Sequence, residues 1–224
     1  MKTLNDGQVL EVSATDPGFI SDIRAWCRNT SNTFICDEKL DTKWVVEIQK
    51  GLSSHAVANK ESAPAEVKSK EKTMVVFSGE LDKAIASFII ANGAAAMGNN
   101  VTMFFTFWGL NVLRKPEPVS VKKDFMATMF SKMMPRGSKK LGLSKMNMAG
   151  MGPKMIRKVM ADKNISSLEE LIKTGMNSGI RMVACQMSMD VMGITQEELI
   201  EGVEIGGVAT YLDAADDSNV NLFI

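Results

Sequence analysis

The chain has 224 residues, with 26 basic and 26 acidic side chains and a single histidine, His55, in a polar segment. The balanced charge gives no basic surface of the kind that recruits nucleic acid, and this histidine provides neither a Cys-His catalytic pair nor a dedicated zinc site. No apolar run reaches the ~18 residues of a membrane span, and the N-terminus has no signal-peptide core. These features predict a soluble cytoplasmic protein without a nucleic-acid partner, a membrane span, a metal ion or a bound cofactor.

The first 50 residues predict a small α+β unit. The segment QVLEVSAT has the alternation of a strand, and Asp16-Pro17 supplies an N-cap oxygen followed by a proline at the first helical position. In the helix that follows, Ile20, Ile23 and Cys27 fall on one stripe. The segments TFICDEK and KWVVEIQK then predict a hairpin, so the expected order is β-α-β-β.

A change of composition divides the chain. Residues 51–72 are small, polar and charged, with no aromatic side chain and no apolar periodicity, which is typical of a flexible linker. We therefore expect a unit at 1–50, a linker at 51–72 and a larger domain at 73–224.

The larger domain alternates strand and helix patterns. Nearly continuous apolar runs at 73–79, 101–109 and 180–185 predict strands covered on both faces, and LDKAIASFIIANGAAAMG predicts a helix between the first two. SSLEEL and TQEEL both have capping-box spacing, and VEIGG, VATYLDAAD and NVNLFI continue the alternation. The pattern predicts a mainly parallel sheet with helices on both faces.

An insertion at 119–163 carries nine methionines and the basic stretch PRGSKKLGLSK. Methionine fills irregular gaps and adapts to partners, so we expect helical packing or a subunit interface here. Copper binding by thioethers is the alternative, but the methionines show no ordered repeat. The basic side chains indicate a solvated surface or, as an alternative, a docking site for an acidic partner.

Three cysteines are the candidate chemical groups. An odd, sparse set does not predict a disulfide framework. Cys27 and Cys36 are expected in the core of the small unit. Cys185 is different, because it ends a predicted strand, where open α/β sheets gather their ligands and chemistry. Backbone N–H groups of a turn or helix at 186–190 would favour its thiolate, with Ser188 and Asp190 as candidate caps; a small buried hydrophobe is the alternative.

Residues 73–224 resemble the longer, methionine-rich branch of the DsrE/DsrF-like sulfurtransferase family. The resemblance is carried by FFTFWGLNVLRK, KMMPRGSKKLGLSKMNMAGMG, ACQMSMDVMGI and GGVATYLDAADDSNVNLFI. It implies a flavodoxin-like α/β fold, homo-oligomerisation, and sulfane sulfur held as a persulfide on a cysteine that maps onto Cys185.

Residues 7–50 resemble the TusA/SirA sulfur-carrier domain through GQVLEVSATDPGFISDIRAWCRNT and WVVEIQK. Such domains begin with a strand and a helix bearing a Cys-Pro-x-Pro motif, which this chain lacks, so the resemblance implies an N-terminally truncated unit. The two domains are often fused to rhodanese and disulfide-reductase modules. The resemblance therefore implies rhodanese-like, TusA-like or disulfide-reductase proteins as sulfur donors and acceptors.

The combined interpretation is a sulfur-relay protein, a persulfide carrier or sulfurtransferase acting through Cys185. A thiol-based, peroxide-responsive protein is the first alternative, with Cys27 or Cys36 as the resolving thiol. A non-enzymatic oligomeric binding module is the second. The loop SGELDKA after the first strand of the larger domain sits where such folds bind anions, but its single glycine only weakly indicates a nucleotide or flavin site.

Overall fold

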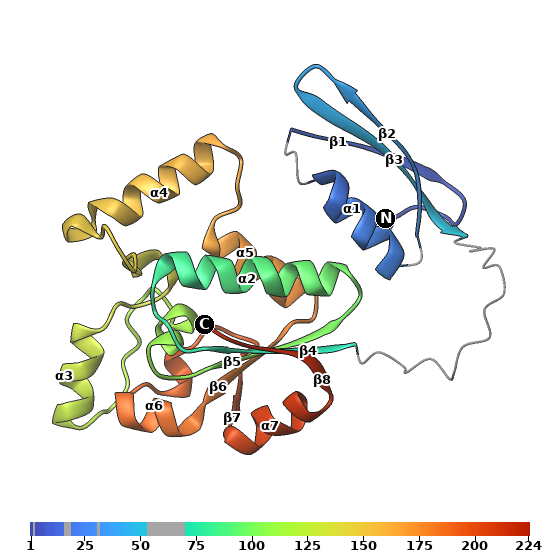
Figure 1. The fold of residues 1–224 in the computed structure, drawn as a ribbon. Coiled ribbons are helices and arrows are strands. Elements are labelled where there is room, and N and C mark those ends of the chain that lie inside the picture. Colours follow the sequence, from blue (N-terminus) through green and yellow to red (C-terminus); the bar gives the residue numbers. More distant parts are fainter. Residues whose placement is uncertain (2, 16–18, 31, 53–69) are drawn as a thin grey trace. The chain divides into compact units, whose positions relative to one another are not determined.

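The computed structural model describes residues 1, 3–15, 19–30, 32–52 and 70–224 (Figure 1). The contacts divide the chain into two compact units, Met1–Val67 and Lys68–Ile224. The predicted linker lies mostly outside the described residues, as does His55. Its expected ends at 51–72 overlap ordered structure, because strand β3 runs to Leu52 and strand β4 begins at Glu71.

The smaller unit is a three-stranded antiparallel sheet packed on one helix. Strands β1 (Val9–Ala14), β2 (Asn32–Leu40) and β3 (Lys43–Leu52) lie in the order β1-β3-β2, and helix α1 spans Phe19–Asn29. The predicted β-α-β-β order is confirmed, whereas the proposed cap at 16–17 lies outside the described residues. A small core holds the unit together; it consists of Cys27, Val46 and Ile48, with partly buried apolar neighbours from α1 and the strands.

The larger unit is built on a five-stranded parallel sheet with the order β7-β6-β5-β4-β8. This order is not that of flavodoxin itself, but the predicted parallel, layered architecture is confirmed. The strands are β4 (Glu71–Val76), β5 (Asn100–Phe105), β6 (Arg181–Cys185), β7 (Glu204–Gly206) and β8 (Ser218–Phe223).

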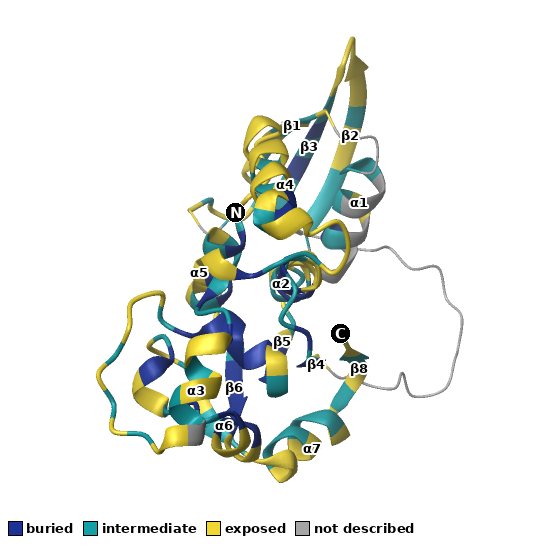
Figure 2. Ribbon diagram, turned by 90° about the vertical axis from the view of Figure 1, so that its left-hand side faces the viewer, coloured by how far each residue is buried: buried dark blue, intermediate teal, exposed yellow. Residues whose placement is uncertain are grey.

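Helices cover the two faces of this sheet unequally (Figure 1). On one face, α2 (Leu81–Ala96) and α5 (Leu168–Asn177) pack together and form the main core with alternate strand residues such as Met103 and Met182. The other face carries α7 (Val208–Asp216), none of whose nine residues, all described, is buried (Figure 2). The second layer over the sheet is therefore thin.

The second predicted apolar run, 101–109, is longer than the strand it forms. Strand β5 stops at Phe105, and the chain continues as a 3-10 helix, η1, at Phe107–Leu113. The reason is a close backbone approach: a Cβ on Gly109 would lie 2.0 Å from the carbonyl oxygen of Val76. Only glycine allows η1 to fold against the end of β4 in this way.

The methionine-rich insertion forms helices on the outside of the unit. They are α3 (Phe125–Met133) and α4 (Met151–Asp162), separated by short 3-10 turns η2 (Ser138–Lys140) and η3 (Met148–Gly150). Asp124 caps α3 by accepting a hydrogen bond from the Ala127 N–H at 2.7 Å. Packing inside the protomer does not explain the methionines, because most of them are exposed: Met129, Met133, Met146, Met148, Met151 and Met155.

Two short elements complete the unit: α6 (Gln186–Met192) directly follows β6, and the 3-10 turn η4 (Gln196–Glu198) follows α6. Within the described ranges 1, 3–15, 19–30, 32–52 and 70–224, no helix has the length and apolar character needed to cross a membrane.

Candidate functional site

Cys185 occupies the junction between strand β6 and helix α6. It is the last residue of β6, it pairs with Gly206 of the neighbouring strand β7, and it is the N-cap residue of α6. Because the sheet is parallel, this junction lies at the edge where all the strands end. The predicted position of the thiol, at the carboxyl end of a strand, is therefore confirmed.

The Cys185 side chain is buried, only 5% exposed, as in the alternative of a small buried residue. It shares a small buried cluster with Phe104 and Val183, and the Tyr211 side chain of α7 packs against that cluster. The Phe104 and Tyr211 rings lie 5.5 Å apart. Strand alternation explains the burial, since Val183 and Cys185 point to the face of the sheet that α7 covers.

The polar side chains after Cys185 make hydrogen bonds to other parts of the same unit. Ser188 is fully buried, and its hydroxyl lies 2.7 Å from that of Thr106 at the end of β5. Asp190 accepts a hydrogen bond from the Gln186 side chain at 2.8 Å. The expectation that Ser188 and Asp190 cap the turn is wrong, and the thiol makes no capping hydrogen bond to α6, whose residues are all described.

The methionines of α6 divide between two surroundings. Met189 and Met192 are buried and belong to the main core cluster, whereas Met187 is 55% exposed. None of the three belongs to the buried cluster around Cys185. The apolar wall next to the thiol is aromatic and aliphatic instead.

The other two cysteines lie in the smaller unit. Cys27 is buried, as predicted, and burial raises the pKa of its thiol. The predicted burial of Cys36 is wrong: its side chain is exposed, and its Sγ lies 3.6 Å from a carboxylate oxygen of Glu47. A register shift between Phe34 and Cys36 pairs Cys36 with Glu47, whereas Phe34 pairs with the core residue Ile48. The shift places Cys36 on the uncovered face of the sheet.

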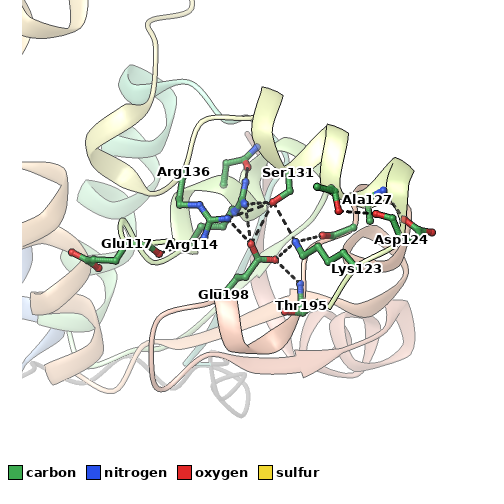
Figure 3. Close-up of polar contacts among 12 residues, drawn as sticks. Arg114, Glu117, Lys123, Asp124, Ala127, Ser131, Arg136, Thr195 and Glu198 are labelled. Atoms are coloured by element: carbon green, nitrogen blue, oxygen red, sulfur yellow. Dashed lines mark hydrogen bonds and ion pairs between the residues drawn. The ribbon is translucent and has the colours of Figure 1, made fainter. Parts of the chain in front are cut away.

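A buried carboxylate with three cationic partners lies close in sequence to this site, and the sequence did not reveal it (Figure 3). Glu198 is 1% exposed, and its Oε1 accepts hydrogen bonds from Arg114 at 3.0 Å and Arg136 at 2.7 Å. Its Oε2 accepts from Lys123. Arg114 follows η1, while Lys123 and Arg136 come from the insertion. The Glu198 carboxylate therefore links the insertion to the rest of the larger unit through these ion pairs.

The capping box predicted in TQEEL, between Thr195 and Glu198, is confirmed. Glu198 accepts from the Thr195 N–H, at 3.1 Å, and it ends a single 3-10 turn. Burial by itself would raise the pKa of Glu198, yet hydrogen bonds from Lys123, the Thr195 N–H and Arg114 outweigh it and lower the pKa to about 2. The carboxylate therefore stays ionised in the folded protein. Arg136, predicted to be part of a solvated or docking surface, is one of its partners.

In the part of the chain that the structure describes, no three His, Cys, Asp or Glu side chains gather as a metal site would require.

Known proteins resemble both units. Residues 68–223 match the model of the "DsrE/DsrF/DrsH-like family", and residues 1–50 match the model described as "Sulfurtransferase TusA". YrkE of Bacillus subtilis is 54% identical over 155 residues, which cover 69% of this chain and 97% of that protein. The "Sulfur carrier protein DsrE2" of Allochromatium vinosum is 36% identical over 159 residues, 69% of this chain and 98% of that one.

A third relative extends over both units. MJ0760 of Methanocaldococcus jannaschii is 22% identical over 223 residues, which are 98% of this chain and 64% of that protein. The two strong matches each cover 69% of this chain and nearly all of the relative. The chain therefore belongs to the DsrE/DsrF/DrsH-like family and carries a TusA domain at residues 1–50.

Proposed function

We propose that this chain is a sulfur carrier that holds sulfane sulfur as a persulfide on Cys185. The observation that carries the proposal is a thiol at the carboxyl end of β6, in a family with a relative named as a sulfur carrier. Of the three cysteines, it is the one located where a parallel sheet gathers its chemistry.

The transfer needs one thiolate and no acid-base pair. The Cys185 thiolate attacks the outer sulfur of a donor persulfide, R–S–SH; a new S–S bond forms, the old one breaks, and the donor leaves as the thiolate R–S⁻. The product is Cys185–S–SH. An acceptor thiolate attacks its outer sulfur in the same way and leaves Cys185 as a thiolate again.

The buried state of the thiol suits a carrier that must keep its cargo. Phe104, Val183 and Tyr211 surround the sulfur with apolar surface, which excludes water and competing thiols from a bound persulfide. Loading then requires an opening. Helix α7 provides it, because a nine-residue helix without a buried residue is held to the sheet by few apolar contacts. Gly206 and Gly207, just before α7, supply the hinge.

We also propose cytoplasmic sulfur donors and acceptors, of the rhodanese-like, TusA-like or disulfide-reductase type, and assembly of the chain into a homo-oligomer. The exposed apolar side chains of α3 and α4 favour assembly; they include Phe125 (81% exposed), Met133 (76%), Met155 (59%) and Met151 (56%). Each of the two helices leaves several large apolar side chains exposed, and such surfaces often mark interaction sites. Size-exclusion chromatography with light scattering gives the assembly state directly.

Sulfur loading of the purified full chain tests the proposal. Exposed Cys36 is a source of non-specific loading, so the experiment starts from the Cys36→Ser variant. Polysulfide is added, the excess is removed, and intact mass followed by peptide mapping locates any gained sulfur. We expect one added sulfur atom on the peptide containing Cys185, and its release by a small thiol.

The matched control is the double variant Cys36→Ser/Cys185→Ser, which retains only the buried Cys27. It should gain no sulfur. An unchanged gain in this double variant, or loading confined to Cys27, contradicts the assignment of Cys185.

A further inference from the structure

A cavity of about 570 Å³ lies in the larger unit, at the carboxyl ends of β4 and β8. Its lining residues include three aromatic side chains, Phe77, Trp108 and Phe223, and three polar ones, Ser78, Lys83 and Asn111. All its lining residues are described, and Cys185 is not one of them. The volume falls in the range of small-molecule sites, roughly 300–1,000 Å³.

The cavity lies beyond the carboxyl ends of two neighbouring strands. Phe77 and Ser78 follow β4 and lead into α2, Trp108 and Asn111 belong to η1, and Phe223 is the last residue of β8. Open α/β sheets bind ligands at this edge.

The walls of the cavity are flat and apolar. Phe77 and Phe223 stack with ring centroids 5.7 Å apart, and Trp108 and Phe223 remain 51% and 71% exposed. The Trp108 backbone lies close to Gly79, where a Cβ would be only 2.8 Å from the Trp108 carbonyl oxygen. Exposed aromatic faces around a cavity favour a planar ligand that stacks on them.

A buried amide without a partner adds a polar requirement. Asn111 is 1% exposed, and its Oδ1 accepts a hydrogen bond from Arg114 Nη1 at 3.4 Å. Its Nδ2 has no hydrogen-bond partner among the residues that the structure describes. A buried donor without a partner destabilises the protein. A ligand oxygen that accepts a hydrogen bond from this amide removes that cost, which makes ligand binding more favourable.

The charges near the amide select the sign of that ligand. Arg114, which holds the Asn111 side chain, belongs to the group of three cations around the single Glu198 carboxylate, a net of two positive charges. At the mouth, Lys83 is paired with Glu80 at 3.4 Å and donates to Ser78 at 3.2 Å, so the rim adds no net charge. The field behind the amide therefore favours a negative group.

We infer that this cavity binds a small organic anion with a planar aromatic body, whose carboxylate accepts from the Asn111 amide while its ring stacks on Trp108 and Phe223. This site is separate from the sulfur chemistry proposed for Cys185. Its occupation does not depend on a thiol.

Isothermal titration calorimetry of the full chain with 2-naphthoate tests the inference. We expect saturable binding at one site, and binding of the neutral analogue 2-naphthamide about tenfold or more weaker. The variant Phe223→Ala should weaken 2-naphthoate binding by about tenfold, since an aromatic stacking contact is of this order. The matched control is Phe125→Ala, which removes an exposed phenylalanine of α3 outside the cavity and should change nothing.

Two further variants separate the contributions. Asn111→Leu keeps the number and branching of the side-chain heavy atoms and removes the donor, so the preference for 2-naphthoate over 2-naphthamide should disappear. Cys185→Ser should bind as the parent does, which keeps the outcome independent of the sulfur-carrier proposal. Absence of saturable binding at millimolar 2-naphthoate, an equal affinity for the amide in the parent, or unchanged binding by Phe223→Ala each overturns the inference.

Discussion

Replacement of Glu198 by glutamine should destabilise the larger unit strongly at neutral pH. The carboxylate is 1% exposed, and its removal leaves Arg114, Lys123 and Arg136 without their shared counter-charge. Removing one partner of a buried ionic group costs on the order of 3–5 kcal/mol. The Glu198→Gln variant should lose about that much of its free energy of unfolding at pH 7.

The pH dependence gives a second, independent value for the contribution of Glu198 to the free energy of unfolding. The pKa of Glu198 falls from 4.5 to about 2 on folding, a difference of about 2.5 that corresponds to about 3 kcal/mol. Because the folded pKa is the lower one, this stability is fully present above pH 4.5 and is lost as the pH falls through 2. Between pH 6 and pH 3 the stability difference between parent and Glu198→Gln should shrink by roughly 2 kcal/mol.

Urea unfolding measures both the loss of stability at pH 7 and its change between pH 6 and pH 3, because urea is uncharged and does not screen ionic interactions. Trp108 reports on the larger unit alone when Trp26 and Trp44 of the smaller unit are replaced by phenylalanine, since the chain has three tryptophans. Glu201→Gln, an exposed neighbour, is the control and should stay within about 0.5 kcal/mol of the parent. A loss below 1 kcal/mol at pH 7, or a difference between parent and Glu198→Gln that is the same at pH 6 and pH 3, refutes the reasoning.

Three further outcomes follow from local geometry. Tyr211→Ala removes the α7 ring from the cluster around Cys185 and should speed the reaction of that thiol with a maleimide, measured by mass spectrometry in the Cys36→Ser background; an unchanged rate argues against α7 as the cover. Ser167→Ala deletes the N-cap of α5, whose hydroxyl accepts from the Glu170 N–H, and should cost about 1 kcal/mol in urea unfolding. Gly109→Ala forces a Cβ to within 2.0 Å of a backbone oxygen and should cost about 3 kcal/mol, seen as a lower melting temperature, whereas Gly93→Ala in the open middle of α2 should raise it.

The layered fold could be predicted because its signals are local. Apolar runs with the length of strands, helix patterns between them, and the capping box at 167–170 all act within a few residues. The end of β5 was missed for a physical reason. The apolar run continues beyond Phe105, and only the close approach of Gly109 to the neighbouring strand turns it into a 3-10 helix.

The candidate site was predictable in position but not in environment. The sequence places Cys185 at the end of a strand, yet the covering of its side chain depends on α7, which follows more than 20 residues later. The Glu198 cluster shows the same limit. Its spacing from Thr195 is visible in the sequence, but its cationic partners lie 62 to 84 residues away along the chain. Only the tertiary fold selects them.

The pairing of β4 with β8 has a consequence for biosynthesis. Residues of these two strands that contact each other, such as Glu71 and Ser218, are separated by 147 positions. Strand β4 leaves the ribosome long before its neighbour on that side is made, so one of its edges stays open through most of translation. An open apolar strand edge attracts other nascent chains. The nascent chain should therefore need chaperones until β8 emerges and pairs with β4.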